Sequence, residues 1–343
     1  MVGVVCLAVV GGFCHASVSA NNHVEWIAFK LKHGKSYASQ AEDASRMANF
    51  LATKERVERH NAKSGNSYLK GLNHMADWTN EERARLNGFK PSQSGLHRSE
   101  AALAESEAYL DKLISGSKAP IPDELDLRQV PGIVGPVGDQ GHCGSCWAFA
   151  TVGALEGQQV YLNITKSKVI PLSVQELVDC SSDEDCGCSG GNMGQAMADI
   201  ATLGGIGSDQ DYPYKAVEGK CNFDKKKAVM SDIGSYGVYE DEEKLRHFIA
   251  LYGPVAVGVY ASDNFFEYHS GVFVDELCSN ENFFTILNHA MLVVGYGTDP
   301  KDGDYWIVKN SWGESWGEKG FIRMKRGVNI CAITKYGAIP KFP

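Results

Sequence analysis

Apolar residues recur at helical spacing in the first part of the chain. In the segment 24–61, Trp26 and Phe29 lie three positions apart and Phe50 and Val57 lie seven apart, with charged residues on the other faces. This pattern is typical of amphipathic helices. Because the apolar stripe of such a helix must be covered, we expect this region to pack against another part of the protein.

The hydrophobic pattern changes further along the chain. Small and apolar residues at helical intervals from Cys146 to Gln159 predict a helix, and Ser173 with Glu176 has capping-box spacing for the start of another. After Asp232, short β-rich runs separated by glycine-rich turns predict strands. These runs are Val255–Tyr260, Ala290–Val294, Tyr305–Val308 and Phe321–Met324. A helical half followed by a sheet half indicates an α+β pair of domains.

A stretch of biased composition with few large apolar residues separates these regions. Ser92–Ser117 is rich in Ser, Ala and Glu, and the Ala119-Pro-Ile-Pro122 sequence would interrupt any helix, so we expect a linker and cleavage zone. Charge differs on its two sides: from Ile121 onward there are 18 Lys and Arg against 30 Asp and Glu, and before it 15 against 12. Opposite signs suggest that the two parts bind each other, or they reflect solvated helix faces. Nucleic acid is not expected to bind the acidic part.

The beginning of the chain indicates export. The apolar run Val2–Phe13 is too short to span a bilayer but suits a secretory signal, and Val18-Ser-Ala20 permits cleavage after Ala20, with Ala16 the second choice. A buried first strand or helix is the alternative, since no basic residue precedes the run. Ten cysteines and an N-glycosylation sequence at Asn163 fit an oxidising compartment. No membrane span is predicted.

Three separated blocks carry the chemistry. They are Gln140-Gly-His-Cys-Gly-Ser-Cys146-Trp-Ala-Phe149, Asn288-His289 and Asn310-Ser-Trp312. Together they supply a thiol nucleophile, a proton acceptor, an amide to orient that acceptor and an amide to stabilise an oxyanion. Cys146 at a helix start and beside the His289 ring is expected to have a lowered thiol pKa, because both supply positive potential.

These blocks, their order, and the Val294-Gly-Tyr-Gly297 and Trp316-Gly317 sequences resemble the papain family of cysteine proteases, of the cathepsin L-like kind. The resemblance implies a papain-like two-domain α+β fold, with a helical left domain, an antiparallel β-barrel-like right domain and an active-site cleft between them. A mainly helical propeptide domain would precede it. The implied divisions are a signal peptide at 1–20, an inhibitory propeptide at 21–120 and a peptidase domain at 121–343.

The resemblance also implies residue roles. Cys146 would be the nucleophile, His289 the acid and base, Asn310 the orienting residue and Gln140 the oxyanion donor. The substrate-binding residues would be Gly190 and Gly191 on a backbone edge, Asn288, Trp312 as a shield over the Asn310–His289 contact, and Met193, Gly258, Leu287 and Tyr336 around an apolar pocket. The implied disulfides are Cys143–Cys188, Cys180–Cys221 and Cys278–Cys331, which leave Cys186 as a free thiol with no catalytic role.

The N-terminal region resembles the inhibitory propeptide of the family. The residues that carry this likeness are Glu42, Arg46, Phe50, Val57 and Asn61 on one helix, followed by Gly71, Asn73 and Asp77. The resemblance implies that the propeptide lies through the cleft in the direction opposite to substrate until acid and cleavage near Pro120-Ile121 release it. No insertion resembles an exopeptidase occluding loop, so internal cleavage is expected. The loop Ser279–Leu287 is long, and its Phe283-Phe284 pair is a candidate for the cleft rim.

Two other classes of function would fit parts of this sequence. Cys143-Gly-Ser-Cys146 by itself could be a redox or zinc-binding pair, but no second ligand pair accompanies it, so neither a cofactor nor a metal is expected. A catalytically silent peptide-binding or scaffold protein is the other alternative, disfavoured because Cys146 is present. The expected partners are protein and peptide substrates, the chain's own propeptide and cystatin-like inhibitors. We expect a monomer in the secretory pathway, either in a lysosome-like acidic compartment or outside the cell.

Overall fold

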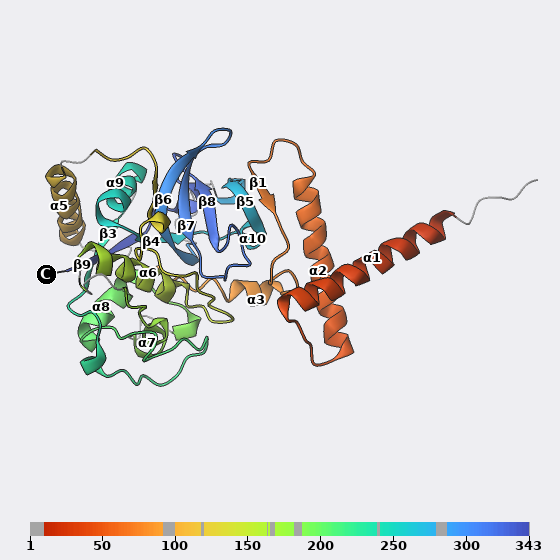
Figure 1. Cartoon of the computed structure of the whole chain (residues 1–343), viewed down its shortest axis with the longest axis horizontal. Helices are drawn as coiled ribbons and strands as arrows, with labels where there is room; N and C mark the ends of the chain where they lie inside the picture. Colours follow the sequence, from red (N-terminus) through yellow and green to blue (C-terminus); the bar gives the residue numbers. More distant parts are fainter. Residues whose placement is uncertain are drawn as a thin grey trace, which may run out of the picture.

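The computed structural model describes residues 10–91, 100–117, 120–162, 164, 169–181, 187–238, 241–278 and 287–342. Several sequence predictions fall outside these ranges: the first nine residues of the signal segment, Asn163, Cys186 and residues 279–286 with the Phe283-Phe284 pair. Helix and sheet are both abundant, as an α+β protein requires (Figure 1). In the described residues, no helix has the length and apolar character that crossing a membrane demands.

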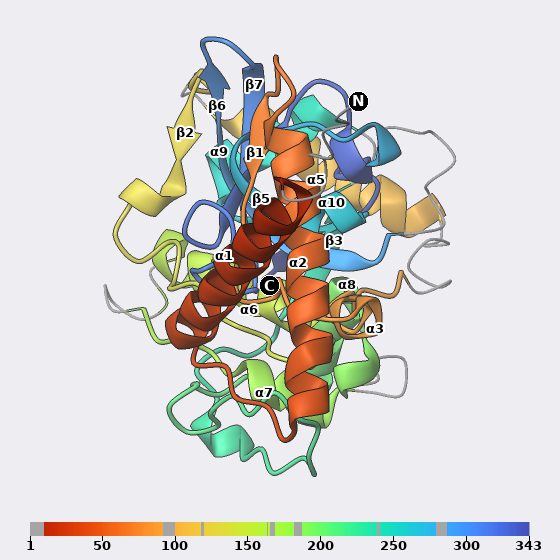
Figure 2. The ribbon, with the colours of Figure 1, turned by 90° about the vertical axis from the view of Figure 1, so that its right-hand side faces the viewer.

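Two long helices form the N-terminal region, as predicted. They are α1 (Val10–His33) and α2 (Gln40–Asn61), joined by a turn in which Gly34 has a φ of 60°. Ser39 caps α2 by accepting a hydrogen bond from the Glu42 backbone N–H. A small core of Trp26, Phe29, Phe50 and Ala76 holds the helices together. Figure 2 shows α1 and α2 lying across one another at one end of the molecule.

A nine-stranded sheet forms the centre of the described structure, in the order β1-β5-β8-β7-β6-β4-β9-β3, with β2 paired to β6. Its strands are β1 (Tyr68–Lys70), β2 (Leu125–Asp126), β3 (Gly234–Val238), β4 (Val255–Val259), β5 (Tyr268–Phe273), β6 (His289–Asp299), β7 (Gly303–Lys309), β8 (Phe321–Lys325) and β9 (Gly337–Lys341). The four predicted runs are confirmed as β4, β6, β7 and β8. Pairing is antiparallel except between β5 and β8. Because β1 pairs with β5, the N-terminal region contributes a strand to the sheet.

Three helices form a group that packs against the sheet. The predicted helices at Cys146 and Ser173 are confirmed as α6 (Cys146–Tyr161) and α7 (Val174–Cys180), and α8 (Met193–Leu203) follows. Helix α6 is buried along most of its length and lies between the sheet and the other two helices (Figure 1). Two helices lie among the strands in the sequence and were not indicated by the sequence pattern: α9 (Glu242–Tyr252), which contacts β4 and β6, and the short α10 (Asp263–Phe266), which precedes β5.

The prediction of a linker at Ser92–Ser117 was wrong for most of that stretch, which forms helix α5 (Glu100–Gly116). The Ala, Leu and Glu residues of this segment are strong helix formers, and their propensity outweighs the scarcity of large apolar side chains. Leu110 is buried, and the Tyr109 ring lies edge-on to Tyr252 of α9 at 6.2 Å. Helix α5 therefore packs beside α9, at the end of the molecule opposite α1 and α2 (Figure 1).

Three disulfides connect the described cysteines. They are Cys143–Cys188, Cys180–Cys221 and Cys278–Cys331, the same pairs that the resemblance implied. Cys146 takes part in none of these disulfides and is buried.

Candidate active site

Cys146 is the first residue of α6 and is fully buried. The backbone N–H groups at a helix start give this position a positive potential. The N–H of Ala290, the second residue of β6, lies beside the thiol and favours its charged form. Cys146 and the start of β6 are therefore neighbours, although 144 positions separate the two residues in the sequence.

His289 is held by the sheet. It is the first residue of β6, where it pairs with Val259 of β4, and its Nε2 atom lies 2.8 Å from Oδ1 of Asn310. Asn310 directly follows β7, the strand that pairs with β6 on its other side. The Trp312 ring lies 4.7 Å from the imidazole. The structure thus brings together His289, Asn310 and Trp312, as predicted, and the Nδ1 atom of His289 has no hydrogen-bond partner among the described residues.

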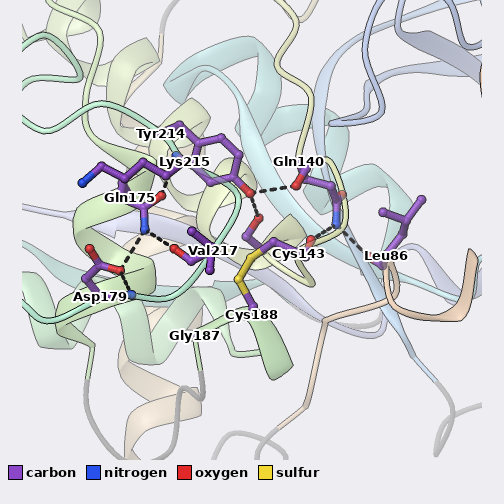
Figure 3. Close-up of a disulfide and its surroundings, with 12 residues drawn as sticks. Leu86, Gln140, Cys143, Gln175, Asp179, Gly187, Cys188, Tyr214, Lys215 and Val217 are labelled. Atoms are coloured by element: carbon purple, nitrogen blue, oxygen red, sulfur yellow. Dashed lines mark hydrogen bonds between the residues drawn. A yellow bond between two sulfur atoms is a disulfide. The ribbon is translucent and has the colours of Figure 1, made fainter. Parts of the chain in front are cut away.

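Gln140 connects this group to the N-terminal region. Its Oε1 atom accepts a hydrogen bond from the Ser311 hydroxyl at 2.8 Å. Its Nε2 atom donates to the carbonyl oxygens of Cys143 at 2.8 Å and Leu86 at 3.0 Å (Figure 3). The side-chain amide predicted to stabilise an oxyanion therefore already binds a peptide carbonyl, one that belongs to the chain's own N-terminal part.

Tyr214 fixes the loop that carries Gln140, and no sequence motif pointed to this residue. Its hydroxyl donates to the Gln140 backbone carbonyl at 2.9 Å and lies 2.6 Å from the Ser145 hydroxyl (Figure 3). The Cys143–Cys188 disulfide ties the same loop to the segment that precedes Gly190. These contacts hold the oxyanion donor and the start of α6 in a fixed relation.

A segment of the N-terminal region, residues 86–90, lies across these groups. The Gly191 N–H donates to the Gly88 carbonyl at 2.9 Å, and the Lys90 N–H donates back to the Gly191 carbonyl at 2.9 Å. On the other side, the Phe89 N–H donates to the Asn288 carbonyl at 2.9 Å. A Cβ atom on Gly88 would lie 1.8 Å from the Gly144 carbonyl oxygen, so only glycine fits there.

The Phe89 side chain fills an apolar pocket. It is 3% exposed and shares one core cluster with Met193, Leu287 and Tyr336, the last at 5.1 Å between ring centroids. A Cβ atom on Gly258 would lie 2.6 Å from the Phe89 ring, so the pocket depends on that glycine. Except for Trp312, which packs on His289, the residues predicted to bind substrate therefore surround this segment, which the sequence pattern did not single out. A glycine flanked by Leu86 and Phe89, just after the propeptide motif, is the signal that could have indicated it.

Burial under this segment reverses the expected protonation of Cys146 and His289. It raises the pKa of the Cys146 thiol to about 11, against the influence of the Ala290 and Gly88 N–H groups. It also lowers the pKa of His289 to about 4, against the hydrogen bond to Asn310. Desolvation disfavours both charged forms and outweighs the helix terminus. In this covered state thiol and imidazole are both neutral near pH 7, so the expected thiolate requires that the segment leave.

Comparison with known proteins agrees with this geometry. Residues 121–341 match the model of the papain family cysteine proteases, and residues 26–83 match the cathepsin propeptide inhibitor domain (I29). Cathepsin L of Sarcophaga peregrina is 39% identical over 325 residues, covering 92% of each chain. Cathepsin S of Mus musculus is 38% identical over 327 residues, covering 92% of this chain and 89% of its own.

Solved proforms have the same fold. The structure of digestive procathepsin L 3 from the larval midgut of Tenebrio molitor matches with a TM-score of 0.79 and 36% identity, covering 94% of this chain and 99% of that one. The chain is thus a cysteine endopeptidase made as a zymogen with an intramolecular inhibitory propeptide, and it belongs to the papain family.

Proposed function

We propose that Cys146 is the nucleophile of this endopeptidase and that His289 is its acid and base. The observation that carries this proposal is the 2.8 Å contact of His289 Nε2 with Asn310 Oδ1, beside a free thiol at the start of α6. In the uncovered enzyme His289 takes the thiol proton, and the thiolate attacks the scissile carbonyl carbon. The ring then gives the proton to the leaving amine, and water hydrolyses the thioester with His289 as base.

Asn310 and Gln140 position and stabilise this reaction. The Asn310 side chain fixes the plane of the imidazole, with Trp312 as a shield over their contact. The Gln140 side-chain amide and the Cys146 backbone N–H stabilise the oxyanion of the tetrahedral intermediate. The hydrogen bond from Gln140 to the Leu86 carbonyl supports this role, because it is made to the same kind of atom.

Substrates are expected to carry an apolar residue two positions before the scissile bond. Phe89 in the pocket of Met193, Gly258, Leu287 and Tyr336 supports this preference. The backbone of Gly190 and Gly191, together with the Asn288 carbonyl, would pair with the main chain of the substrate and read no side chain.

The zymogen is activated by removal of the propeptide. We propose a signal peptide at 1–20, a propeptide at 21–120 and a peptidase domain at 121–343, with cleavage near Pro120-Ile121. Pro120 and Pro122 are exposed, which supports access of a second protease molecule to this site. The mature enzyme is proposed to be a monomer that cystatin-like inhibitors bind. It would act in the secretory pathway, in a lysosome-like compartment or outside the cell.

Substitution of the nucleophile tests the proposal. The Cys146→Ala zymogen should fold yet fail to process itself at acid pH, and it should not be labelled by an irreversible thiol-directed epoxide. Cys186→Ala is the matched control, because it removes a thiol without an assigned role and should leave processing and stoichiometric labelling intact. Normal autoprocessing of Cys146→Ala would refute the assigned nucleophile and favour the scaffold alternative.

A further inference from the structure

One buried carboxylate of the peptidase domain binds three cations of the propeptide. Glu267 lies between α10 and β5 and is 2% exposed. Its oxygens lie 2.7 Å from Nε of Arg56, 3.0 Å from Nζ of Lys70 and 3.7 Å from a terminal nitrogen of Arg83. All three cations belong to the segment that activation removes, so the mature enzyme loses these partners of Glu267.

A short series of contacts links Glu267 to the catalytic histidine. The neighbouring Phe266 ring stacks on Trp312 at 4.7 Å, and Trp312 lies 4.7 Å from the His289 ring. The Arg83 guanidinium lies 5.8 Å from the centre of the Phe266 ring. Arg83 therefore contacts an aromatic face and a carboxylate at the same time, in the part of the cleft beside Trp312.

The path of the propeptide shows on which side of the scissile bond Arg83 and Glu267 lie. Along the chain, Arg83 comes before Leu86, whose carbonyl accepts a hydrogen bond from Gln140. Phe89 comes after Leu86 and fills the apolar pocket. The apolar pocket takes the residue two before the scissile bond under the proposed function. Because Arg83 lies on the other side of the Gln140 contact, it marks the region where substrate residues after the scissile bond would bind.

Acidic and amide side chains of the peptidase domain surround Arg83 and Lys70. Burial lowers the pKa of Arg83, and the carboxylates of Glu267 and Asp263 oppose that shift. Asn264 accepts a hydrogen bond from Nζ of Lys70 at 2.7 Å. These three acceptors all come from the peptidase domain, so they stay in the mature enzyme after the propeptide cations have left.

We propose that Phe266 and Glu267 form a binding site in the mature enzyme for a Lys or Arg side chain located after the scissile bond of the substrate. The stem or guanidinium of that side chain lies on the Phe266 ring, and its charge pairs with Glu267. The inference rests on the proposed function and adds a second determinant of specificity to the apolar pocket. Since Glu267 loses all three propeptide cations on activation, a basic substrate residue can replace them and a neutral one cannot.

Peptides that differ only after the scissile bond test the site. The mature enzyme is assayed with internally quenched peptides that have the same residues before the scissile bond and either Lys or norleucine at the first, second or third position after it. We expect kcat/KM to be about fivefold higher for Lys than for norleucine at one of these positions. This ratio corresponds to the free energy of one half-exposed ion pair. A ratio of one at all three positions would overturn the proposal.

Variants separate this site from other causes. In Glu267→Gln the preference for Lys should fall to about one, while kcat/KM for a coumarin amide with no residue after the scissile bond should be unchanged. Glu276→Gln is the matched control, because it removes an exposed carboxylate nearby in the sequence and should keep the preference. An unchanged preference in Glu267→Gln would show that Glu267 serves only to hold the propeptide.

Two further results distinguish failure of this site from failure to mature and from failure of the proposed function. If Glu267→Gln does not mature, Glu267→Asp keeps the charge on a shorter side chain and should retain a reduced preference, whereas a full preference would argue against the site. If the wild-type enzyme cleaves neither the peptides nor the coumarin amide after stoichiometric propeptide removal, the proposed function fails rather than this inference.

Discussion

The propeptide contacts the peptidase domain in two regions of opposite character. Over the cleft, residues 86–90 make backbone hydrogen bonds to Gly191 and Asn288 and insert an apolar ring, so no charged group takes part in these contacts. Beside the cleft, Arg56, Lys70 and Arg83 surround one carboxylate, Glu267. The first region covers the catalytic pair, and the second holds the propeptide beside it through charge.

This difference indicates where acid acts. Backbone hydrogen bonds and a buried ring do not titrate, so the pH dependence of the cleft contact comes from His289 beneath it. Its lowered pKa makes the covering less favourable as the pH falls from the ordinary histidine range toward 4. Protonation of a carboxylate removes its attraction for neighbouring cations. We therefore expect acid to act in two places: protonation of His289 weakens the covering of the cleft, and protonation of ion-paired carboxylates such as Glu82 weakens the propeptide domain.

The largest effect is expected from Glu267→Gln in the zymogen. The substitution leaves three cations around a neutral group, and breaking a buried ion pair from one side costs about 3 kcal/mol. The unfolding of the propeptide domain by urea, measured at pH 7 in the non-processing Cys146→Ala background, should show this loss. A midpoint equal to that of Cys146→Ala alone would mean that the cations do not depend on Glu267.

Gly88→Ala should give the next largest effect. This substitution lies in the uncharged contact, where residues 86–90 cover the cleft. The added methyl group meets the Gly144 carbonyl, and such overpacking costs about 2 kcal/mol, or roughly 30-fold in the occupancy of the cleft. The intact zymogen should then hydrolyse a small peptide substrate at pH 7. Gly116→Ala is the matched control, since a Cβ atom there meets nothing within 4 Å and should leave the zymogen inactive.

Glu82→Gln tests an ion pair within the propeptide. Arg46 lowers the pKa of Glu82 to about 2, so the pair stabilises the fold above the ordinary carboxyl range and this stabilisation is lost as the pH falls toward 2. We expect a loss of about 1 kcal/mol at pH 7 and pH 5. Urea unfolding in the Cys146→Ala background should show the difference from wild type closing between about pH 4.5 and 2.

The control for Glu82→Gln is Glu55→Gln, which removes an exposed ion pair with Arg59 on α2. This variant should change stability little at any pH. If the difference for Glu82→Gln instead grew on acidification, the sign of the shift assigned to Glu82 would be wrong.

The smallest effect is expected at helix α5, far from both regions. Glu105→Gln removes a half-exposed pair with Lys341, which is expected to contribute less than about 0.5 kcal/mol. Limited proteolysis of residues 100–117 should be only slightly faster in this variant than in the unsubstituted zymogen. Inhibition of the active site by the propeptide should not change. A leak of activity comparable to that of Gly88→Ala would show that α5 takes part in covering the active site.

The candidate catalytic residues could be singled out from the sequence because each has a distinct chemical role within a recognisable sequence block. The Glu267 cluster could not be predicted, because the carboxylate lies between two aromatic residues in a run without a recognisable motif. Its three cations lie between 184 and 211 positions earlier in the chain. Helix α5 was missed because its composition suggested a linker, although its helix propensity was high. The protonation of Cys146 was misjudged for the zymogen, since burial by residues 86–90 depends on a contact that only the folded structure contains.

Labelling of Cys146 by a thiol-directed epoxide at pH 7, compared between the intact zymogen and the processed enzyme, tests the account most directly. We predict stoichiometric labelling of the processed enzyme at Cys146 and a zymogen that stays unlabelled over the same time. Equal labelling of the two forms would contradict a nucleophile covered by residues 86–90, and the absence of labelling in the processed enzyme would contradict Cys146 as the nucleophile.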